Sequence, residues 1–447
     1  MNKFWKRFAL AVGIVLLLVF FGGYFWLKSS IPQYSGEIQI HLNNPTSVYF
    51  DEYGIPHIEA SNKHDAFKAL GYVHAQERLF QMELLRRVGS GRLSEIIGKD
   101  GIKVDRVFRT LGVANYAKQC SINLTQSGDT ALLNELNAYL NGVNEFIQNG
   151  PTPPEFALIG IEKSNLTIED LYCITGAMSF GFSQANKTEP VITKIAMQYG
   201  NEYLKDLGLW HGSSESYIPN TGIPDTALIN VFNLFNEAEK AMPVAPFNGS
   251  NSWAVSGTIT ESGKPLFCND THIGYGLPQT WFEAHVKYPN NEIHGHFLGG
   301  IPYALIGKTP HYSWGLTMLL NDDMDFYFEH FNPNNKEEVL YKNKYVSVTH
   351  RTEIIHVKGQ SDLTLDVLET PHGPIINSGI HGFESNQAIS CKWEFVQKKN
   401  KTIEAFRGLN QSKSFNEFLS YLPLIHSPGL SVNYADDSNN IAWVACA

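Results

Sequence analysis

Ser250 is the residue in this sequence whose surroundings best suit nucleophilic chemistry. It follows Gly249 in the segment NGSNSWAVSG at 248–257. A serine hydroxyl is a weak nucleophile that needs a base, and the chain has no G-x-S-x-G elbow. A serine at a new N-terminus carries its own base, because a free α-amino group has a pKa of about 7.7–8.0. The sequence therefore suggests cleavage between Gly249 and Ser250, with an ordinary turn before a strand as the alternative.

A hairpin after this segment is expected to bring a histidine to the serine. The residues on both sides of the turn at 260–263 favour strands, and His272 follows the second of them. If the hairpin is centred in the middle of that turn, position 250 lies opposite position 273. We therefore expect Ser250 and His272 to lie close together. The alternative is that His272 is only a turn residue.

A second group of residues whose side chains could bind a ligand consists of three aspartates, Asp322, Asp323 and Asp325. Carboxylates this close in sequence repel one another unless water or a cation separates them, and calcium takes about six to eight oxygen ligands. The cluster predicts a calcium site, with a solvated acidic loop as the alternative. A metal-dependent hydrolase that uses His294, His296 and this cluster is less consistent with the sequence, because the chain contains no H-E-x-x-H motif.

The elements that hold these residues change in type along the chain. Apolar residues at helical spacing predict helices over 65–88, 132–147 and about 188–199. The segment from about 211 to 248 has Gly, Ser and Pro clusters and is interpreted as a surface linker or spacer. Short apolar and aromatic runs broken by Gly, Asn, Asp and Pro predict strands after it. A helical half followed by a strand-rich half indicates the α+β class.

Composition and net charge indicate the class of protein and the partners that it would not bind by charge alone. Hydrophobic residues make up 43% of the 447 residues and charged ones 17%, which is typical of a folded globular protein. The net charge of −10 argues against nucleic acid as a partner, because bulk electrostatics would not hold a phosphate backbone.

The N-terminal segment is a separate unit. Lys3, Lys6 and Arg7 precede an uncharged run at 8–27, about the length that crosses a bilayer as a helix. The positive flank predicts that this end stays in the cytoplasm and that residues from about 28 onward are exported. No A-x-A-like cleavage site follows, which favours an uncleaved anchor over a cleaved signal.

Several segments together resemble the penicillin acylase family, which includes penicillin, cephalosporin and acyl-homoserine-lactone acylases. The matching segments are DEYGIPHIEA (51–60), ALGYVHAQERLFQMELLRRVGSGRLSEIIG (69–98), NGSNSWAVSG (248–257), SGKPLFCNDTHIG (262–274), SWGLTMLLNDDMDFYFEHF (313–331) and NYAD (433–436). The resemblance implies an N-terminal-nucleophile hydrolase with a four-layer αββα sandwich. It also implies one precursor that loses a spacer, so that Ser250 becomes the first residue of a β chain that stays with its α chain.

The resemblance implies four regions: a membrane anchor or signal at 1–30, an α-chain region at 31–210, a spacer at 211–249 and a β-chain region at 250–447. It implies hydrolysis of a linear amide, the acyl side chain of a β-lactam or related small N-acyl compound. The N-terminal segment itself predicts a location outside the cytoplasm, anchored through residues 8–27 in the bacterial inner membrane and facing the periplasm.

Site residues carry over from the resemblance one at a time. Ser250 matches the nucleophile, and His272 stands where many members have a histidine beside it. The backbone N–H of Met318 or Leu319 matches one oxyanion donor. Ser431 stands where the family has the asparagine that supplies the second donor.

The implied calcium ion would be held by the carboxylates of Glu189, Asp322 and Asp325 and by the backbone carbonyl of Met324. Four histidines without a matching role are interpreted as structural: His74, His294, His296 and His311.

Two departures from the family pattern keep a second hypothesis open. Serine at position 431 is shorter than asparagine, and Asn433, two residues on, reaches the same place only if the register shifts. The family's β chain also runs well beyond the NYAD region, whereas this sequence stops at Ala447, just after the strand-like residues 441–444. The alternative to an active enzyme is therefore a non-catalytic remnant, a membrane-anchored binding protein of truncated or split origin.

Overall fold

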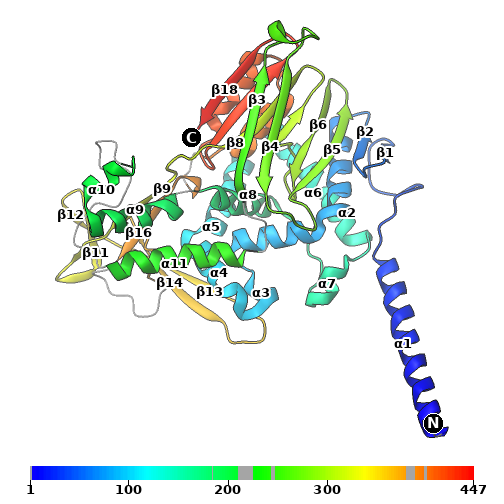
Figure 1. The fold of residues 1–447 in the computed structure, drawn as a ribbon, viewed down its shortest axis with the longest axis horizontal. Helices are drawn as coiled ribbons and strands as arrows, with labels where there is room; N and C mark the ends of the chain where they lie inside the picture. The colour runs from blue at the N-terminus through cyan, green and yellow to red at the C-terminus, as the bar shows by residue number, and fades with distance from the viewer. Residues whose placement is uncertain (1–2, 184, 210–224, 243–246, 379–387, 397–399) are drawn as a thin grey trace.

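The fold is that of a computed structural model, which describes residues 3–183, 185–209, 225–242, 247–378, 388–396 and 400–447 (Figure 1). The helices in those ranges are α1 (Lys3–Ser29), α2 (Lys63–Ser90), α3 (Ser94–Ile97), α4 (Ile102–Leu111), α5 (Val113–Gln126), α6 (Thr130–Asn149), α7 (Pro154–Ile159), α8 (Ile168–Phe182), α9 (Ala185–Tyr199), α10 (Asn201–Asp206), α11 (Asp225–Ala241), α12 (Thr402–Gln411) and α13 (Phe415–Tyr421). The helices expected over 65–88, 132–147 and 188–199 are confirmed as α2, α6 and α9.

A large sheet is the centre of the molecule, with the strand order β1-β2-β5-β6-β7-β8-β17-β18. Its strands are β1 (Ser47–Phe50), β2 (Pro56–Glu59), β5 (Trp281–Tyr288), β6 (Asn291–Leu298), β7 (Ile306–Lys308), β8 (Tyr312–Met318), β17 (Leu430–Asp436) and β18 (Ile441–Cys446). Strand β2 pairs in parallel with β5, and this contact joins the N-terminal hairpin to strands more than two hundred positions later in the chain. Mixed helices and sheets confirm the α+β class.

Helices cover one face of this sheet. Along β5 the side chains of Phe282, Ala284 and Val286 are buried, and they belong to the same hydrophobic cluster as residues of α2, α6 and α8. Helix α2 begins where the Asn62 side chain accepts a hydrogen bond from the Asp65 N–H, and it ends at a C-cap glycine with a positive φ. The apolar stripe of this helix packs on the sheet and shields one of its faces from solvent.

A separate hairpin of β3 (Phe247–Val255) and β4 (Leu266–Ile273) packs against β8 and β17 of the large sheet. In Figure 1 these two long strands lie in front of the large sheet, with β18 beside them. The hairpin is confirmed, but the residues expected to extend its first strand form a 3₁₀ turn at Gly257–Ile259, where the Ser256 side chain caps the turn. Local side-chain capping here replaces strand pairing.

Three smaller sheets complete the strand-rich part. They are formed by β10 (Phe331–Asn332), β11 (Asn335–Tyr341) and β12 (Lys344–Ser347); by β13 (Thr349–Ile355), β14 (Leu363–Thr370) and β15 (Gly373–Pro374); and by β9 (Met324–Phe328) and β16 (Ile389–Trp393). The β9–β16 pair lies over a second hydrophobic cluster with residues of α4, α8 and α11.

Helix α11 corrects one expectation from the sequence. The segment 211–248 was interpreted as a surface linker, yet its part at 225–241 is a helix in which Val231, Phe235 and Ala238 are buried against the second cluster. These apolar residues recur at spacings of three and four, a helical pattern that the neighbouring Gly, Ser and Pro clusters concealed. The parts at 210–224 and 243–246 lie outside the described residues.

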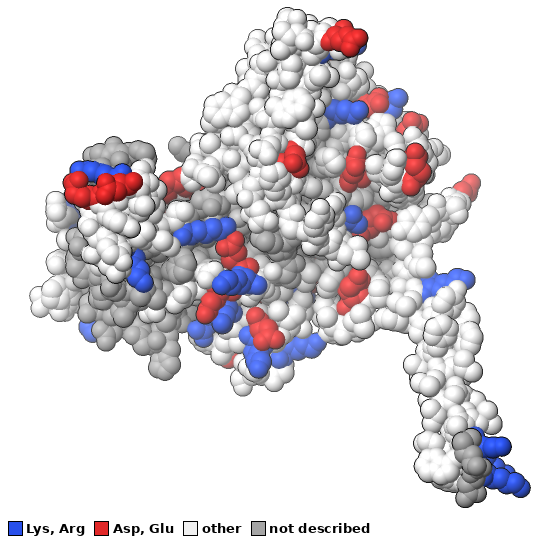
Figure 2. Space-filling model, in the orientation of Figure 1, with Lys and Arg blue, Asp and Glu red and all other residues white. Residues whose placement is uncertain are grey.

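Helix α1 stands apart from the rest of the molecule (Figure 1). Among the described residues it is the helix that is long and apolar enough to cross a membrane, and none of its side chains is buried. Figure 2 shows basic side chains gathered at its free end and an uncharged shaft between them and the body.

Candidate active site

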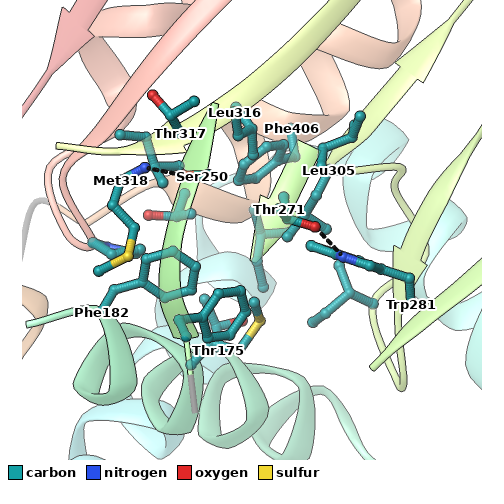
Figure 3. Close-up of a pocket in the computed structure, with 18 residues that line it drawn as sticks. Thr175, Phe182, Ser250, Thr271, Trp281, Leu305, Leu316, Thr317, Met318 and Phe406 are labelled. Atoms are coloured by element: carbon teal, nitrogen blue, oxygen red, sulfur yellow. Dashed lines mark hydrogen bonds between the residues drawn. The ribbon is translucent and has the colours of Figure 1, made fainter. Parts of the chain in front are cut away.

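The Ser250 hydroxyl lies against the backbone of the large sheet. Strand β3 carries it opposite Thr271 of β4, and its Oγ accepts a hydrogen bond of 3.1 Å from the Met318 N–H at the end of β8 (Figure 3). A backbone N–H beside a nucleophile is also near the carbonyl that the nucleophile attacks, where an oxyanion would develop. The Gly249–Ser250 peptide bond lies within β3 itself, so this is the geometry of an uncleaved chain.

The two candidate backbone donors, the N–H groups of Met318 and Leu319, have different acceptors. The Leu319 N–H donates to the Gly429 carbonyl at 3.2 Å, whereas the Met318 N–H points at Ser250. Ser431 lies on β17 opposite Thr317, one position before Met318 on β8, and is buried. Ser431 is thus on the strand beside the Met318 donor, and Asn433 lies two residues further along the same strand.

Sequence reasoning missed Asn269, which fixes the hairpin to the large sheet. Its Nδ2 donates to the carbonyls of Asn251 and Leu316, each at 3.0 Å, and its Oδ1 accepts from the Leu316 N–H at 3.0 Å. Gly315 makes room for this contact, because a Cβ there would lie 2.8 Å from Asn269 atoms. The available signal was the asparagine in CNDTH, between a strand and the expected histidine.

The structure separates His272 from the Ser250 hydroxyl, contrary to expectation. Ser250 pairs with Thr271 and not with position 273, and His272 pairs with Gly249. Because successive side chains point to opposite faces of a strand, His272 lies on the face away from Ser250. Its Nε2 is 3.0 Å from an Asp270 carboxylate oxygen and 3.3 Å from the Asn251 amide nitrogen. The observed partner of Ser250, Thr271, lies two positions earlier on β4 than the expected position 273.

An apolar pocket opens beside Ser250 (Figure 3). Its wall is formed by side chains from α8, the large sheet and α12, among them Met178, Phe182, Trp281, Leu305, Ile306, Leu316 and Phe406. The Trp281 indole donates to the Thr271 hydroxyl at 2.9 Å, which satisfies both polar groups at the pocket wall. Such a lining suits an apolar group bound next to the nucleophile.

Phe247, three residues before Ser250, is also part of this wall. Its ring packs on Phe182 with centroids 4.1 Å apart. Phe247 and Met178 line a second groove as well, between α2, α8 and α11. These two side chains therefore separate the pocket from the groove in the uncleaved chain.

The three aspartates of the acidic cluster differ in burial and in their partners. Asp323 is buried, and its carboxylate accepts hydrogen bonds from the hydroxyls of Ser183 at 2.7 Å and Ser427 at 2.8 Å, so it links α8 to the strand-rich half. Asp322 and Asp325 are exposed, and Asp325 lies 3.9 Å from the Lys392 ammonium. The sequence did not distinguish Asp323 from its neighbours.

Glu189 of α9 faces the same charges. Burial, with the charges of Asp322 and Asp325, raises the pKa of Glu189 to about 8. Burial, with the charges of Asp325 and Asp323, raises the pKa of Asp322 to about 6. Within the described residues no three His, Cys, Asp or Glu side chains are already grouped tightly enough to hold a metal.

Three of the four histidines interpreted as structural have polar partners in the fold. His74 is buried, stacks on Phe282 with centroids 4.3 Å apart and hydrogen-bonds to the Tyr139 hydroxyl. His311 pairs with Asp437 at 2.9 Å on the surface. His294 and His296 lie on β6, where His294 pairs with Glu283 at 2.8 Å.

Comparison with known sequences gives the family. The family model described as penicillin amidase matches residues 45–447. The chain belongs to the penicillin amidase family. Acyl-homoserine lactone acylase QuiP of Pseudomonas aeruginosa is 27% identical over 482 residues, which cover 99% of this chain and 54% of that protein.

Two further matches are proteins named as penicillin acylases. Penicillin acylase 2 proenzyme of Pseudomonas sp. (strain SE83) is 30% identical over 365 residues, which cover 78% of this chain and 46% of that protein. Among solved structures, thermostable penicillin G acylase from Alcaligenes faecalis in its orthorhombic form aligns with a TM-score of 0.40 at 23% identity, over 44% of this chain and 35% of that chain. This penicillin amidase family member spans about half the length of the curated relatives it matches.

We predict that Asn269→Asp weakens the attachment of the hairpin in this penicillin amidase family member. A carboxylate cannot donate to the Asn251 and Leu316 carbonyls, and loss of the partly buried hydrogen bond to Leu316 costs about 0.5–1.5 kcal/mol. The variant should melt at a lower temperature, and the Leu316 amide should exchange its hydrogen faster. In the control, Asn123→Asp, the replaced residue only accepts a hydrogen bond, from Gln119, so stability should be unchanged. Equal melting temperatures for both variants would contradict the assigned role.

Proposed function

We propose that this chain is the precursor of a self-processing amide hydrolase in which Ser250 cuts its own chain and then its substrate. The observation that carries the proposal is the 3.1 Å hydrogen bond from the Met318 N–H to the Ser250 hydroxyl, next to an apolar pocket. Family membership supports it, since relatives in this family carry names such as acyl-homoserine lactone acylase and penicillin acylase proenzyme.

In the maturation step, the Ser250 hydroxyl attacks the carbonyl carbon of Gly249. The C–O bond forms while the Gly249–Ser250 C–N bond breaks, and the proton from the hydroxyl ends on the released α-amino group. Water then hydrolyses the ester, which leaves a Gly249 carboxylate and a free Ser250. The Met318 N–H supplies a fixed dipole where the carbonyl oxygen becomes negative.

In the catalytic step, the same hydroxyl attacks the substrate amide, with the new α-amino group as general base. Its pKa of about 7.7–8.0 in the absence of perturbation suits proton transfer near neutral pH. The asparagine of the family pattern is replaced by Ser431 at the second donor position. Loss of one oxyanion donor typically lowers the rate by a factor of about 10²–10³, so we expect slow turnover unless Ser431 or Asn433 reaches the oxyanion.

The substrate class follows from the pocket. An apolar acyl group of a small N-acyl amide, such as the side chain of a β-lactam or of an acyl-homoserine lactone, would enter the apolar pocket beside Ser250. Phe247 belongs to the segment that cleavage releases from Ser250. Its departure would join the pocket to the groove between α2, α8 and α11, and would enlarge the space for the acyl group.

The remaining features of the proposal concern the whole molecule. The helices on one face of the large sheet and the β3–β4 hairpin on its other face are consistent with three layers of an αββα sandwich. Cleavage would leave α and β chains that share the hydrogen bonds of Ser183 with Asp323 and of Ser179 with Ser427 and therefore remain associated. Helix α1 would anchor this body, exported, in the inner membrane on the periplasmic side.

Ser250→Ala should leave a single uncut chain without amidase activity. The wild-type protein should instead give a β chain that begins Ser250-Asn251-Ser252-Trp253, detected by intact mass and N-terminal sequencing. Ser252→Ala is the matched control two residues along the same strand, where the hydroxyl only donates to the Cys268 carbonyl, and it should be cut. A wild-type chain that stays whole and resists serine-directed acylating inhibitors would favour the non-catalytic remnant.

We also propose one calcium ion held by Glu189, Asp322 and Asp325 with the Met324 carbonyl. Burial, together with the repulsion between neighbouring carboxylates, raises the pKa values of Glu189 and Asp322, which fits a place for a divalent cation, and all donors are hard oxygen atoms. Because an ion that binds only the folded state stabilises it, chelation should lower the melting temperature. Asp322→Asn should abolish that difference, whereas Asp362→Asn, on the exposed surface beside His356, should retain it. An unchanged wild-type melting curve after chelation would reject the site.

Deletion of residues 1–28 behind a cleavable signal should release soluble exported protein. The native chain should remain in the membrane fraction after a high-salt wash and leave it only with detergent, because α1 is held by apolar burial and not by charge. Native protein in the soluble cytoplasmic fraction would show that α1 is not an anchor.

A further inference from the structure

Three histidines form a row across the large sheet, away from Ser250. His57 of β2 pairs directly with His285 of β5, and His285 pairs directly with His294 of β6. Residues paired across strands place their Cβ atoms about 4.5–5.5 Å apart on one face. This face is opposite the one where Phe282, Ala284 and Val286 pack on the helices. The row is therefore set by strand register.

Each of these imidazoles has a carboxylate at Nε2. The distances are 3.5 Å from His57 to Asp51, 3.1 Å from His285 to Glu292 and 2.8 Å from His294 to Glu283. A carboxylate that accepts from Nε2 fixes the neutral imidazole in the tautomer with its lone pair on Nδ1. Metal-bound histidines have the same arrangement, in which an outer carboxylate orients the ring.

The Nδ1 atoms of His57 and His285 lie 3.0 Å apart. With both Nε2 atoms donating to carboxylates, two lone pairs face each other and need a positive charge between them. Both rings are largely shielded from solvent, with 18% and 16% of their side-chain surfaces exposed. Burial lowers the pKa of His285, which favours the neutral ring.

We propose that His57 and His285 bind a divalent transition-metal ion of the Zn²⁺ type through their Nδ1 atoms. Imidazole nitrogen is a preferred ligand of Zn²⁺, Cu²⁺ and Ni²⁺, whereas Ca²⁺ and Mg²⁺ prefer oxygen. Zn–N bonds of about 2.0–2.1 Å in a tetrahedral site separate two ligand nitrogens by roughly 3.3 Å. The two rings need only move apart by a few tenths of an ångström.

The remaining coordination positions go to His294 and to water. The His294 ring centroid lies 5.9 Å from that of His285 and 6.4 Å from that of His57. Since no three such side chains among the described residues are already grouped around one point, His294 must turn toward the ion to bind it. Bound metal would join the β1–β2 hairpin at the sheet edge to β5, so its effect is on stability.

His350 differs from the three histidines of the row because carboxylates lie beside both of its ring nitrogens. Both of its nitrogens lie beside carboxylates, at 2.7 Å from Glu337 and 2.8 Å from Asp366, and these hydrogen bonds raise its pKa. His350 therefore has no lone pair to offer. It serves as a control histidine with carboxylate partners on the surface of the same molecule.

The test is metal binding by the full chain purified in detergent and stripped of metal. Zn²⁺ should raise the melting temperature by a few degrees and bind once per chain after gel filtration, measured by elemental analysis, whereas Mg²⁺ should have neither effect. His57→Ala and His285→Ala should each lose the shift and the bound zinc, and His350→Ala should keep both. Co²⁺ should give visible absorption bands of nitrogen coordination in the wild type and lose them in His285→Ala.

Zinc bound equally by wild type and both variants, or no zinc bound by the wild type, would overturn the proposal. If a variant fails to fold, shown by lost far-ultraviolet circular dichroism, His57→Gln and His285→Gln replace it. A wild type that binds no zinc but whose β2–β5 contact opens on acidification would show that a shared proton lies between the rings in place of a metal. None of these results depends on cleavage at Ser250 or on calcium.

Discussion

The Asn269 carboxamide is the contact on which the geometry at Ser250 depends. It uses both its donor and its acceptor on backbone atoms of Leu316 and its second donor on Asn251, so it sets the position of β3–β4 along β8. Strand β3 carries the serine, and β8 ends at the Met318 donor. A shift of the hairpin along β8 would move the Ser250 hydroxyl away from the Met318 N–H.

Two hydrophobic clusters hold together the elements around this hairpin. The larger cluster holds α2, α6 and α8 to one face of the large sheet and includes Trp314 of β8. The smaller one joins α4 and α11 to β9 and β16. Helix α11, in the segment expected to be removed as a spacer, contributes Phe235 to that smaller cluster. The described part of this segment, at 225–241, therefore takes part in the fold and is not a loose connection.

Charge is arranged differently in the two possible cation sites. Around Glu189 and Asp322, uncompensated carboxylates raise one another's pKa values, which suits a hard cation bound by oxygen. Around His57 and His285, carboxylates on the outer nitrogens leave inner lone pairs opposed, which suits a softer ion bound by nitrogen. The two proposed sites would therefore select different classes of ion.

The sequence by itself determined the helices α2, α6 and α9, the hairpin around 260–263, the apolar N-terminal helix and the family, because each of these depends on local periodicity or on contiguous motifs. It also placed Ser250 and the alternatives Met318 and Leu319. Only the tertiary structure decided that Met318 and not Leu319 points at the serine, since Gly429 takes the Leu319 N–H. Only it turned His272 to the other face and aligned His57 with His285. These outcomes depend on register between strands far apart in the chain, which no local pattern encodes.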